Sequence, residues 1–190
     1  MFIQTPFLSN FLTASEDFNH NYKLNYLTKF NYVNIFETKK CLKITLNFGF
    51  KDFKFEKKQM ILYFFLLELL SNQKCVLTKS SKNLIAFKLK KGSVTGCKVT
   101  LRKDNLNAFL ETLSLSLPRS EIFKGLSFKT LSDKQNSFST KLKHLYIFYN
   151  LEFEVGNRIN TLDLTFNFNT VSDVEKCFFF TYFKIPLHYV

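Results

Sequence analysis

The sequence predicts an α+β fold in which helices pack on one face of an open, mainly antiparallel sheet. Two patterns lead to this prediction. Several short segments alternate apolar and polar residues with the period of two that is typical of a strand with one buried face. Between them, longer segments repeat apolar residues at helical spacing. A chain of 190 residues with 46% hydrophobic content is long enough to bury one core of this kind.

The alternation is clearest in residues 42–47, 97–102 and 161–169, where the apolar set begins with Leu42, Cys97 and Leu162. Residues 74–78, 84–90 and 138–148 are shorter or less regular strand candidates. The polar set would leave the second face of the sheet free to meet a ligand. Its members are Lys43, Thr45, Asn47, Lys98, Thr100, Arg102, Thr161, Asp163, Thr165, Asn167 and Asn169.

Three helices are expected. The first covers the apolar run of residues 60–70 and opens at Glu56. The second runs from Asp104, its expected N-cap, to Leu117, because Pro118 can end it. The third begins at Ser172, which forms a capping-box pattern with Glu175. The expected apolar stripes are Leu106, Phe109, Leu110, Leu113 and Leu117 in the second helix, and Val174, Cys177, Phe178 and Tyr182 in the third.

We expect no membrane insertion. The apolar run of residues 60–70 contains Glu68 and is about half as long as the roughly 20 residues of a bilayer span. The first 23 residues lack the cationic start and compact apolar centre of a secretory signal. They are expected to be an N-terminal extension of unknown role, followed by one domain over residues 24–190.

The charge pattern favours a polyanionic partner. The net charge is +12, and residues 69–103 contain nine cations and no Asp or Glu. Apolar residues interleave these cations, which indicates a structured basic surface. Thr, Asn and Gln can bind ribose hydroxyls and base edges, while Lys and Arg bind phosphates, so RNA is the favoured ligand. A solvated sheet surface is the alternative for any single strand, and an anionic membrane surface is the second candidate partner for the chain.

The four cysteines, Cys41, Cys75, Cys97 and Cys177, form no C-x-x-C pair and share no ligand spacing with the histidines. A metal site is therefore not expected, and no cofactor is. A thiol-dependent enzyme that uses Cys97 or Cys177 remains the alternative from another functional class.

The composition points to the kind of genome that encodes the chain. Phe, Lys and Asn, which have AT-rich codons, are abundant, whereas the chain has only 5 Gly and 3 Pro residues. This skew suggests an organelle genome.

Several strings, in this order, resemble the bacterial-type large-subunit ribosomal protein five family. They are Phe30-Asn31-Tyr32, KITLN at residues 43–47, Leu77-Thr78-Lys79, Phe87-Lys88, GCKVTLR at residues 96–102, Leu117-Pro118-Arg119 and FKGLS at residues 123–127. The resemblance spans about residues 24–183. It departs from the family at residues 133–138, which replace a Gly-Arg-Gly-Asn-Tyr-like run, and at residues 149–154. Together with the composition, these departures favour a divergent organellar member, mitochondrial in the first place, over a bacterial or typical plastid one.

The resemblance implies a five-stranded antiparallel sheet and a structural, non-catalytic role in the large ribosomal subunit. The implied partners are 5S rRNA, large-subunit rRNA, P-site tRNA and neighbouring ribosomal proteins of the central protuberance. It places 5S contacts at Asn47, Gln73, Thr100 and Asp163, to which the polar face adds Lys43, Thr45, Lys98 and Arg102. The tRNA-facing loop would be the segment from about Lys79 to Gly96, with Gly92 and Gly96 as flexible points and with the cations Lys79, Lys82, Lys88, Lys90 and Lys91. A free-standing RNA-binding factor is the alternative among binding proteins.

Overall fold

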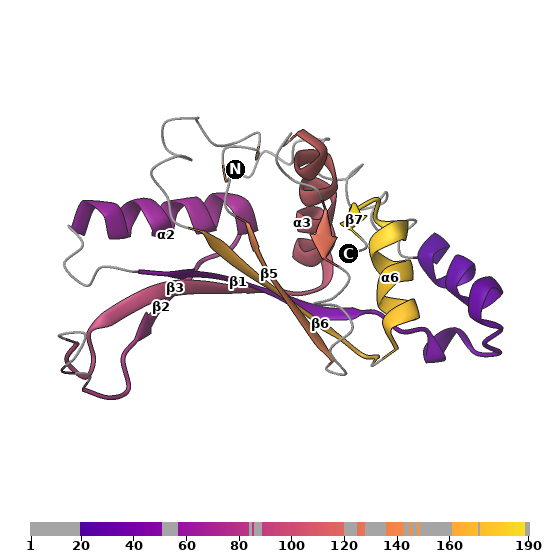
Figure 1. Ribbon diagram of the computed structural model, residues 1–190, viewed down its shortest axis with the longest axis horizontal. Helices are drawn as coiled ribbons and strands as arrows, with labels where there is room; N and C mark the ends of the chain where they lie inside the picture. The colour runs from indigo at the N-terminus through magenta and orange to yellow at the C-terminus, as the bar shows by residue number, and fades with distance from the viewer. Residues whose placement is uncertain are drawn as a thin grey trace, which may run out of the picture.

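In a computed structural model of the chain, helices lie along one side of a twisted sheet (Figure 1). The described residues are 20–50, 57–83, 85, 89–119, 125–127, 136–142, 145, 148, 161–170 and 172–188. The chain begins there with an N-terminal helix over residues 20–30. The further elements are η1 (Ile35–Glu37), β1 (Cys41–Gly49), α2 (Lys57–Ser71), β2 (Val76–Lys79), β3 (Val94–Leu101), α3 (Lys103–Ser116), η3 (Leu117–Arg119), β4 (Leu126–Ser127), β5 (Ser137–Leu142), β6 (Leu162–Phe168), α6 (Asp173–Tyr182) and β7 (Leu187–His188).

The main sheet has five strands in the order β2-β3-β1-β6-β5. Each strand runs antiparallel to its neighbours, so the predicted α+β architecture with an open antiparallel sheet is confirmed. A separate parallel pair joins β4 to β7. Because β1 is the central strand, it sets the register of both halves of the sheet.

The predicted alternation in β1 fails at one residue. A bulge lies between Cys41 and Lys43, where the register against β6 shifts. Cys41 therefore takes the buried position opposite Phe168, and Leu42 is half exposed instead of continuing the apolar face. A bulge places two residues of one strand against one of its partner, which is why period-two counting from Ile44 back to Leu42 was wrong here.

The core lies between the sheet and the helices. The predicted stripe of α3, from Leu106 to Leu117, is buried completely, and so are the apolar faces of β1, β3 and β6. α2 confirms the helix expected over residues 60–70 and begins at Lys57. Figure 1 shows α2 and α3 on the same side of the sheet, which leaves the opposite side uncovered by helices among the described residues. None of the helices described has the length and apolar character that crossing a membrane requires.

The start of α3 differs from the expectation. Arg102, not Asp104, occupies the N-cap position, and its side chain makes no capping hydrogen bond. Asp104 lies in the first turn, where its negative charge interacts favourably with the positive end of the helix dipole. The end was predicted correctly, since α3 stops at Ser116 and passes into η3, which contains Pro118.

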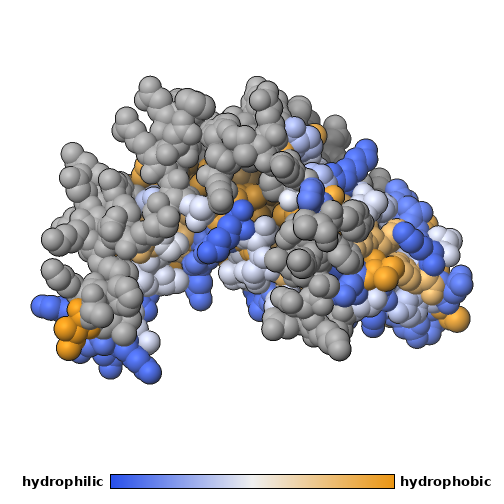
Figure 2. All heavy atoms as spheres, in the orientation of Figure 1, coloured by the Kyte–Doolittle hydropathy of each residue, from blue (hydrophilic) through white to orange (hydrophobic). Residues whose placement is uncertain are grey.

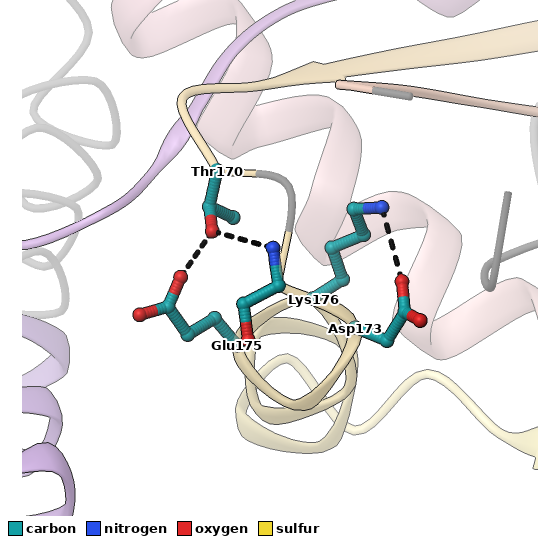
Figure 3. A network of polar contacts seen from close by, with 5 residues as sticks. Thr170, Asp173, Glu175 and Lys176 are labelled. Atoms are coloured by element: carbon teal, nitrogen blue, oxygen red, sulfur yellow. Dashed lines mark hydrogen bonds and ion pairs between the residues drawn. The ribbon is translucent and has the colours of Figure 1, made fainter. Parts of the chain in front are cut away.

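The capping-box prediction for α6 is correct in position and wrong in mechanism. Ser172 is the N-cap, but its side chain makes no capping bond. Thr170, rather than Ser172, makes the hydrogen bond to Glu175. Its Oγ1 donates to the Glu175 carboxylate and accepts from the backbone N–H of Ser172 (Figure 3). The hydroxyl of Tyr32 also donates to Glu175, at 2.9 Å. Burial raises the pKa of Glu175, but these hydrogen bonds, led by that from Thr170, outweigh it and lower the pKa below its ordinary value.

The expected apolar stripe of α6 is only partly right. Val174 is 64% exposed, whereas Lys176, Phe179 and Phe180 are buried. Lys176 lies 3.3 Å from Asp173 through its Nζ atom (Figure 3). Phe178 and Tyr182 pack instead against Tyr22, with ring centroids 5.9 and 5.1 Å away. The helix therefore has two apolar sides, one toward the sheet and one toward the N-terminal helix.

The N-terminal helix lies beside α6 (Figure 1). Tyr22 and Tyr26 are both buried in this contact. Residues 20–23, which were expected to belong to the extension, form the first turn of this helix. The division between residues 23 and 24 stays a prediction, and residues 1–19 lie outside the described part of the chain.

Two strand candidates end differently from the expectation. β5 stops at Leu142, and Leu145 lies in a 3-10 turn, so the expected strand over residues 138–148 is shorter than predicted. In residues 84–90, Ile85 lies in a 3-10 turn and Leu89 is an isolated bridge residue. The remainder of that candidate, Leu84 and residues 86–88, lies outside the described residues, as do the departures at residues 133–135 and 149–154.

Candidate nucleic-acid interface

The uncovered side of the sheet carries three rows of polar residues, which we call the polar face. The register places Asn47 between Lys98 and Asp163, and Asp163 opposite Lys141. A second row joins Thr100, Thr45, Thr165 and Ser139, and a third joins Lys43, Asn167 and Ser137. Side chains directly opposite each other on neighbouring strands have Cβ atoms about 5 Å apart. The rows therefore form one continuous polar surface across four strands.

The cations of the polar face lie toward its margins. Lys98 and Lys141 bracket the first row and are exposed. Asp163 lies 3.9 Å from Lys141 through Oδ1, in a pair that solvent screens and that adds little stability. The second row is neutral, and Ser139 and Thr165 share a hydroxyl hydrogen bond of 3.1 Å. The arrangement offers hydrogen-bonding groups at the centre and cations at the sides.

Two acceptors on the polar face are shielded from water and lack a hydrogen-bond partner among the described residues. They are Oδ1 of Asp163, which has only the ion-pair contact of 3.9 Å with Lys141, and Oδ1 of Asn167. Leaving such a group unpaired costs about 1–3 kcal/mol. A ligand that donates a hydrogen bond here would recover that cost.

Two predicted residues lie at the border of the polar face. Gln73 donates a hydrogen bond from Nε2 to the carbonyl oxygen of Thr100 and accepts one from Asn105, both at 2.9 Å. It therefore ties the end of α2 to β3 and α3. Arg102 follows β3 and is exposed at the start of α3. The other predicted contacts, Lys43, Thr45, Asn47, Lys98, Thr100 and Asp163, all belong to the three rows.

The basic loop connects β2 to β3, and Figure 1 shows it extending away from the helices. Its base is held by backbone hydrogen bonds from Ser80 to Ser93 and from Gly92 to Ser80, each of 2.9 Å. Asn83 Oδ1 accepts a bond of 2.6 Å from the backbone N–H of Lys91. Figure 2 shows hydrophilic residues gathered at this end of the molecule. The exposed cations there are Lys79, Lys82, Lys90 and Lys91, while Lys88 lies outside the described residues.

The two glycines of the loop segment have different roles. Gly92 adopts φ of 86° in the turn, a conformation that favours glycine, and its role as a flexible point stays a prediction. Gly96 is not a flexible point, because it lies inside β3 opposite Gly49. A Cβ atom on Gly96 would lie 2.3 Å from the carbonyl oxygen of Phe48. Close backbone approach, rather than flexibility, requires glycine at this position.

Sequence reasoning did not single out five residues of the polar face. Thr165 and Asn167 were placed on the correct face by alternation, but nothing in the sequence set them apart from other solvent-facing residues. Ser137, Ser139 and Lys141 belong to β5, whose faces were indistinct in the sequence. The pairing of β5 with β6, which the sequence does not reveal, brings all five together.

The described thiols are poorly suited to catalysis. Cys97 is fully buried, and burial raises its pKa to about 12. Burial also raises the pKa of Cys177. Because the thiolate is the nucleophile, both shifts oppose the alternative of a thiol-dependent enzyme. Among the described residues, no group of three or more His, Cys, Asp or Glu side chains could hold a metal ion.

Comparison with known proteins gives consistent matches. Residues 94–187 match the model of the C-terminus of the ribosomal L5 protein family. The chain is 34% identical over 169 residues to the large ribosomal subunit protein uL5m of Reclinomonas americana, covering 87% of this chain and 92% of that protein. It is 35% identical over 170 residues to uL5 of Wigglesworthia glossinidia brevipalpis, with coverage of 87% and 95%. It is 35% identical over 148 residues to uL5 of Wolbachia pipientis from Culex pipiens, with coverage of 77% and 83%.

Proposed function

This chain belongs to the uL5 family of large ribosomal subunit proteins, and we propose that it binds 5S rRNA on the polar face and contacts P-site tRNA through the basic loop. As a member of this family it is a structural constituent of the large subunit and acts in translation. The same proposal includes large-subunit rRNA and neighbouring proteins of the central protuberance as partners. It assigns no catalytic step to the chain.

The three polar rows are the observation that supports the 5S rRNA proposal. Hydroxyl and amide side chains in a flat array can bind the 2′-hydroxyls and base edges that an irregular RNA exposes. Lys98 and Lys141 at the ends of the first row can neutralise phosphates on either side. The face is free of covering helices among the described residues, so an RNA could reach it without rearrangement of the fold.

The basic loop supports a second RNA contact. Its cations project from a base that is closed by hydrogen bonds, and Asp and Glu are absent from residues 69–103. A loop built in this way can present charge at a distance from the sheet, where a different RNA can be bound.

We propose that the protein is located in a mitochondrial ribosome, with a plastid ribosome as the alternative. The proposal is based on the composition and on the similarity to the Reclinomonas protein.

The test of 5S binding uses Asn47→Ala and Thr100→Val. Each should weaken binding by about 1–3 kcal/mol, because a donor or acceptor on the RNA loses its partner. Binding is measured by titration of the full chain into labelled 5S rRNA, and folding is checked by thermal melting. The matched controls are Asn25→Ala and Thr181→Val, which change exposed residues of the N-terminal helix and α6. Unchanged affinity in both test variants would show that the polar face is not the docking surface.

A second measurement separates a ribosomal protein from a free-standing RNA-binding factor. Organelle extracts are sedimented after a high-salt wash, and the chain is located by antibody. Retention with the large subunit is expected, because contacts to rRNA and to neighbouring proteins would hold it there. Release into the soluble fraction, with 5S binding intact, would favour the free-standing factor.

A further inference from the structure

A cavity of about 370 Å³ opens where four parts of the chain meet. Its walls come from the N-terminal helix, the first residues of β1, the first turn of α3 and α6. Cavities that bind small molecules have volumes of about 300 to 1,000 Å³, so this cavity is at the lower end of that range. It can hold one nucleoside-sized group and is too small for a duplex.

The cations around this cavity have no carboxylate among them. Lys23, Lys40, Arg102 and Lys103 line it, and no Asp or Glu does within the described part of the chain. The first turn of α3 adds the positive end of its dipole, which has no side-chain cap at Arg102 and is partly offset by the charge of Asp104. The cavity therefore attracts anions, and the phosphates of a nucleic acid are anions that Lys and Arg neutralise.

Asn107 indicates a more specific ligand. Its side chain is only 9% exposed and lines the cavity, yet it makes no hydrogen bond to any described residue. A carboxamide both donates and accepts, as the edge of a nucleobase does, so the two can pair through two hydrogen bonds. Because the carboxamide lines the cavity without a partner among the described residues, it is available to a bound base.

The remaining wall is apolar. Phe179 and Phe183 contribute aromatic rings, and Leu42 lies at the edge because the β1 bulge turns it out of the core. Lys103, which also lines the cavity, has φ of 51°, a left-handed conformation that is costly for a residue with a side chain. Bulges and strained backbone concentrate at functional sites, and here both border one cavity.

We propose that this cavity receives a single unpaired nucleotide of ribosomal RNA. The base lies against the apolar wall and pairs with the Asn107 carboxamide, while its flanking phosphates contact Lys23, Lys40, Arg102 and Lys103. The inference rests on the proposed function, since it takes the ligand to be rRNA. It adds a base-reading contact outside the polar face and the basic loop.

The first test is photochemical crosslinking on assembled large subunits that contain the full chain. After irradiation and nuclease digestion, a nucleotide adduct is expected on a peptide that carries Tyr22, Phe179 or Phe183. The variant Lys23→Gln/Lys40→Gln should lower the yield several-fold. The variant Lys29→Gln/Lys184→Gln removes the same charge from exposed positions elsewhere and should leave the yield unchanged.

The second test titrates the isolated full chain with a single-stranded RNA oligonucleotide, the same oligonucleotide with one abasic position, and a free nucleoside monophosphate. Asn107→Leu should weaken binding of the intact strand about tenfold, as loss of a bidentate base contact does. It should have little effect on the abasic strand. Lys23→Gln/Lys40→Gln should reduce the slope of log affinity against log salt concentration by about 1.4. Each phosphate contact on a single strand contributes about 0.7 to this slope, and the variant removes two contacts. Melting curves confirm that both variants are folded.

The outcomes separate this inference from the function on which it rests. Adducts on strands β1, β3 and β6 without any at the cavity would overturn the nucleotide site and leave polar-face docking in place. Absence of adducts at both would count against both proposals. If the free monophosphate binds as tightly as the intact strand, the cavity is a soluble-nucleotide site, and the rRNA source is wrong.

Discussion

At the scale of single residues, Gly96 shows how little space separates β3 from its neighbours. A Cβ atom there would meet the Phe48 carbonyl oxygen at 2.3 Å and the Thr78 hydroxyl at 3.0 Å. The backbone oxygen cannot move without disturbing the central strand. Gly49, directly opposite in the register, has nothing within 4 Å of its own Cβ position.

This contrast gives a matched pair of variants. Gly96→Ala should destabilise the fold by about 1–3 kcal/mol, the usual cost of forcing extra volume into a packed site. Gly49→Ala should leave the free energy of unfolding within about 0.5 kcal/mol of the wild type, as surface substitutions do. Urea denaturation measures both. Equal stability of the two variants would mean that β3 shifts away from β1 at little cost.

Residue-level prediction from the sequence succeeded where the signal is local. Alternation placed Asn47, Thr100 and Asp163 on one face, and pairing then joined them. It failed at Glu175, because Tyr32, one of its hydrogen-bond donors, lies 143 residues away in the sequence. A capping box is a local pattern, and it cannot reveal that a distant hydroxyl competes for the same carboxylate.

At the scale of elements, α3 is the helix whose sequence and structure agree best. Its apolar residues recur at helical spacing, and every one of the predicted stripe faces the core. Its first turn was misplaced because the chain leaves β3 through a left-handed Lys103, a conformation that spacing patterns do not encode. The strand after residue 142 was overestimated for a related reason, since apolar residues in a 3-10 turn can mimic a strand.

The packing of α3 can be tested with two substitutions on its opposite sides. Phe109 is 2% exposed, so Phe109→Ala should cost about 3–5 kcal/mol through the cavity that it leaves. Leu115 is 75% exposed on the same helix, and Leu115→Ala should change stability little. Thermal and urea unfolding report both. If Phe109→Ala melted normally yet lost RNA affinity, the ring would be a stacking surface for a base rather than a core residue.

At the scale of the whole molecule, the basic loop lies at one end of the sheet that carries the polar face, and we expect the two surfaces to bind different RNAs (Figure 1). Replacing Lys82, Lys88, Lys90 and Lys91 by Gln should leave 5S affinity and its salt slope nearly unchanged. Retention of P-site tRNA on assembled ribosomes should fall. The cause is the loss of phosphate neutralisation. Each phosphate contact contributes about 0.7 to the slope of log affinity against log salt concentration on a single strand, and about 0.9 on a duplex.

The opposite result would reassign the loop. A large fall in the 5S salt slope, with tRNA retention unchanged, would place these lysines on the 5S surface. The two readouts are a 5S titration across salt concentrations and filter binding of tRNA to purified ribosomes. Thermal melting of the variant is the control for folding, and no change is expected because the described lysines are exposed.

The contact between the N-terminal helix and α6 has a consequence for how the protein is made. Tyr22 and Tyr26 are synthesised more than 150 residues before the rings that bury them, Phe178 and Phe179 among them. The helix over residues 20–30 therefore keeps its aromatic side exposed until α6 emerges from the ribosome that is translating the chain. Contacts between distant parts of a chain slow folding and prolong exposure to aggregation. A chaperone that shields an aromatic helix during synthesis would be of most use to this chain.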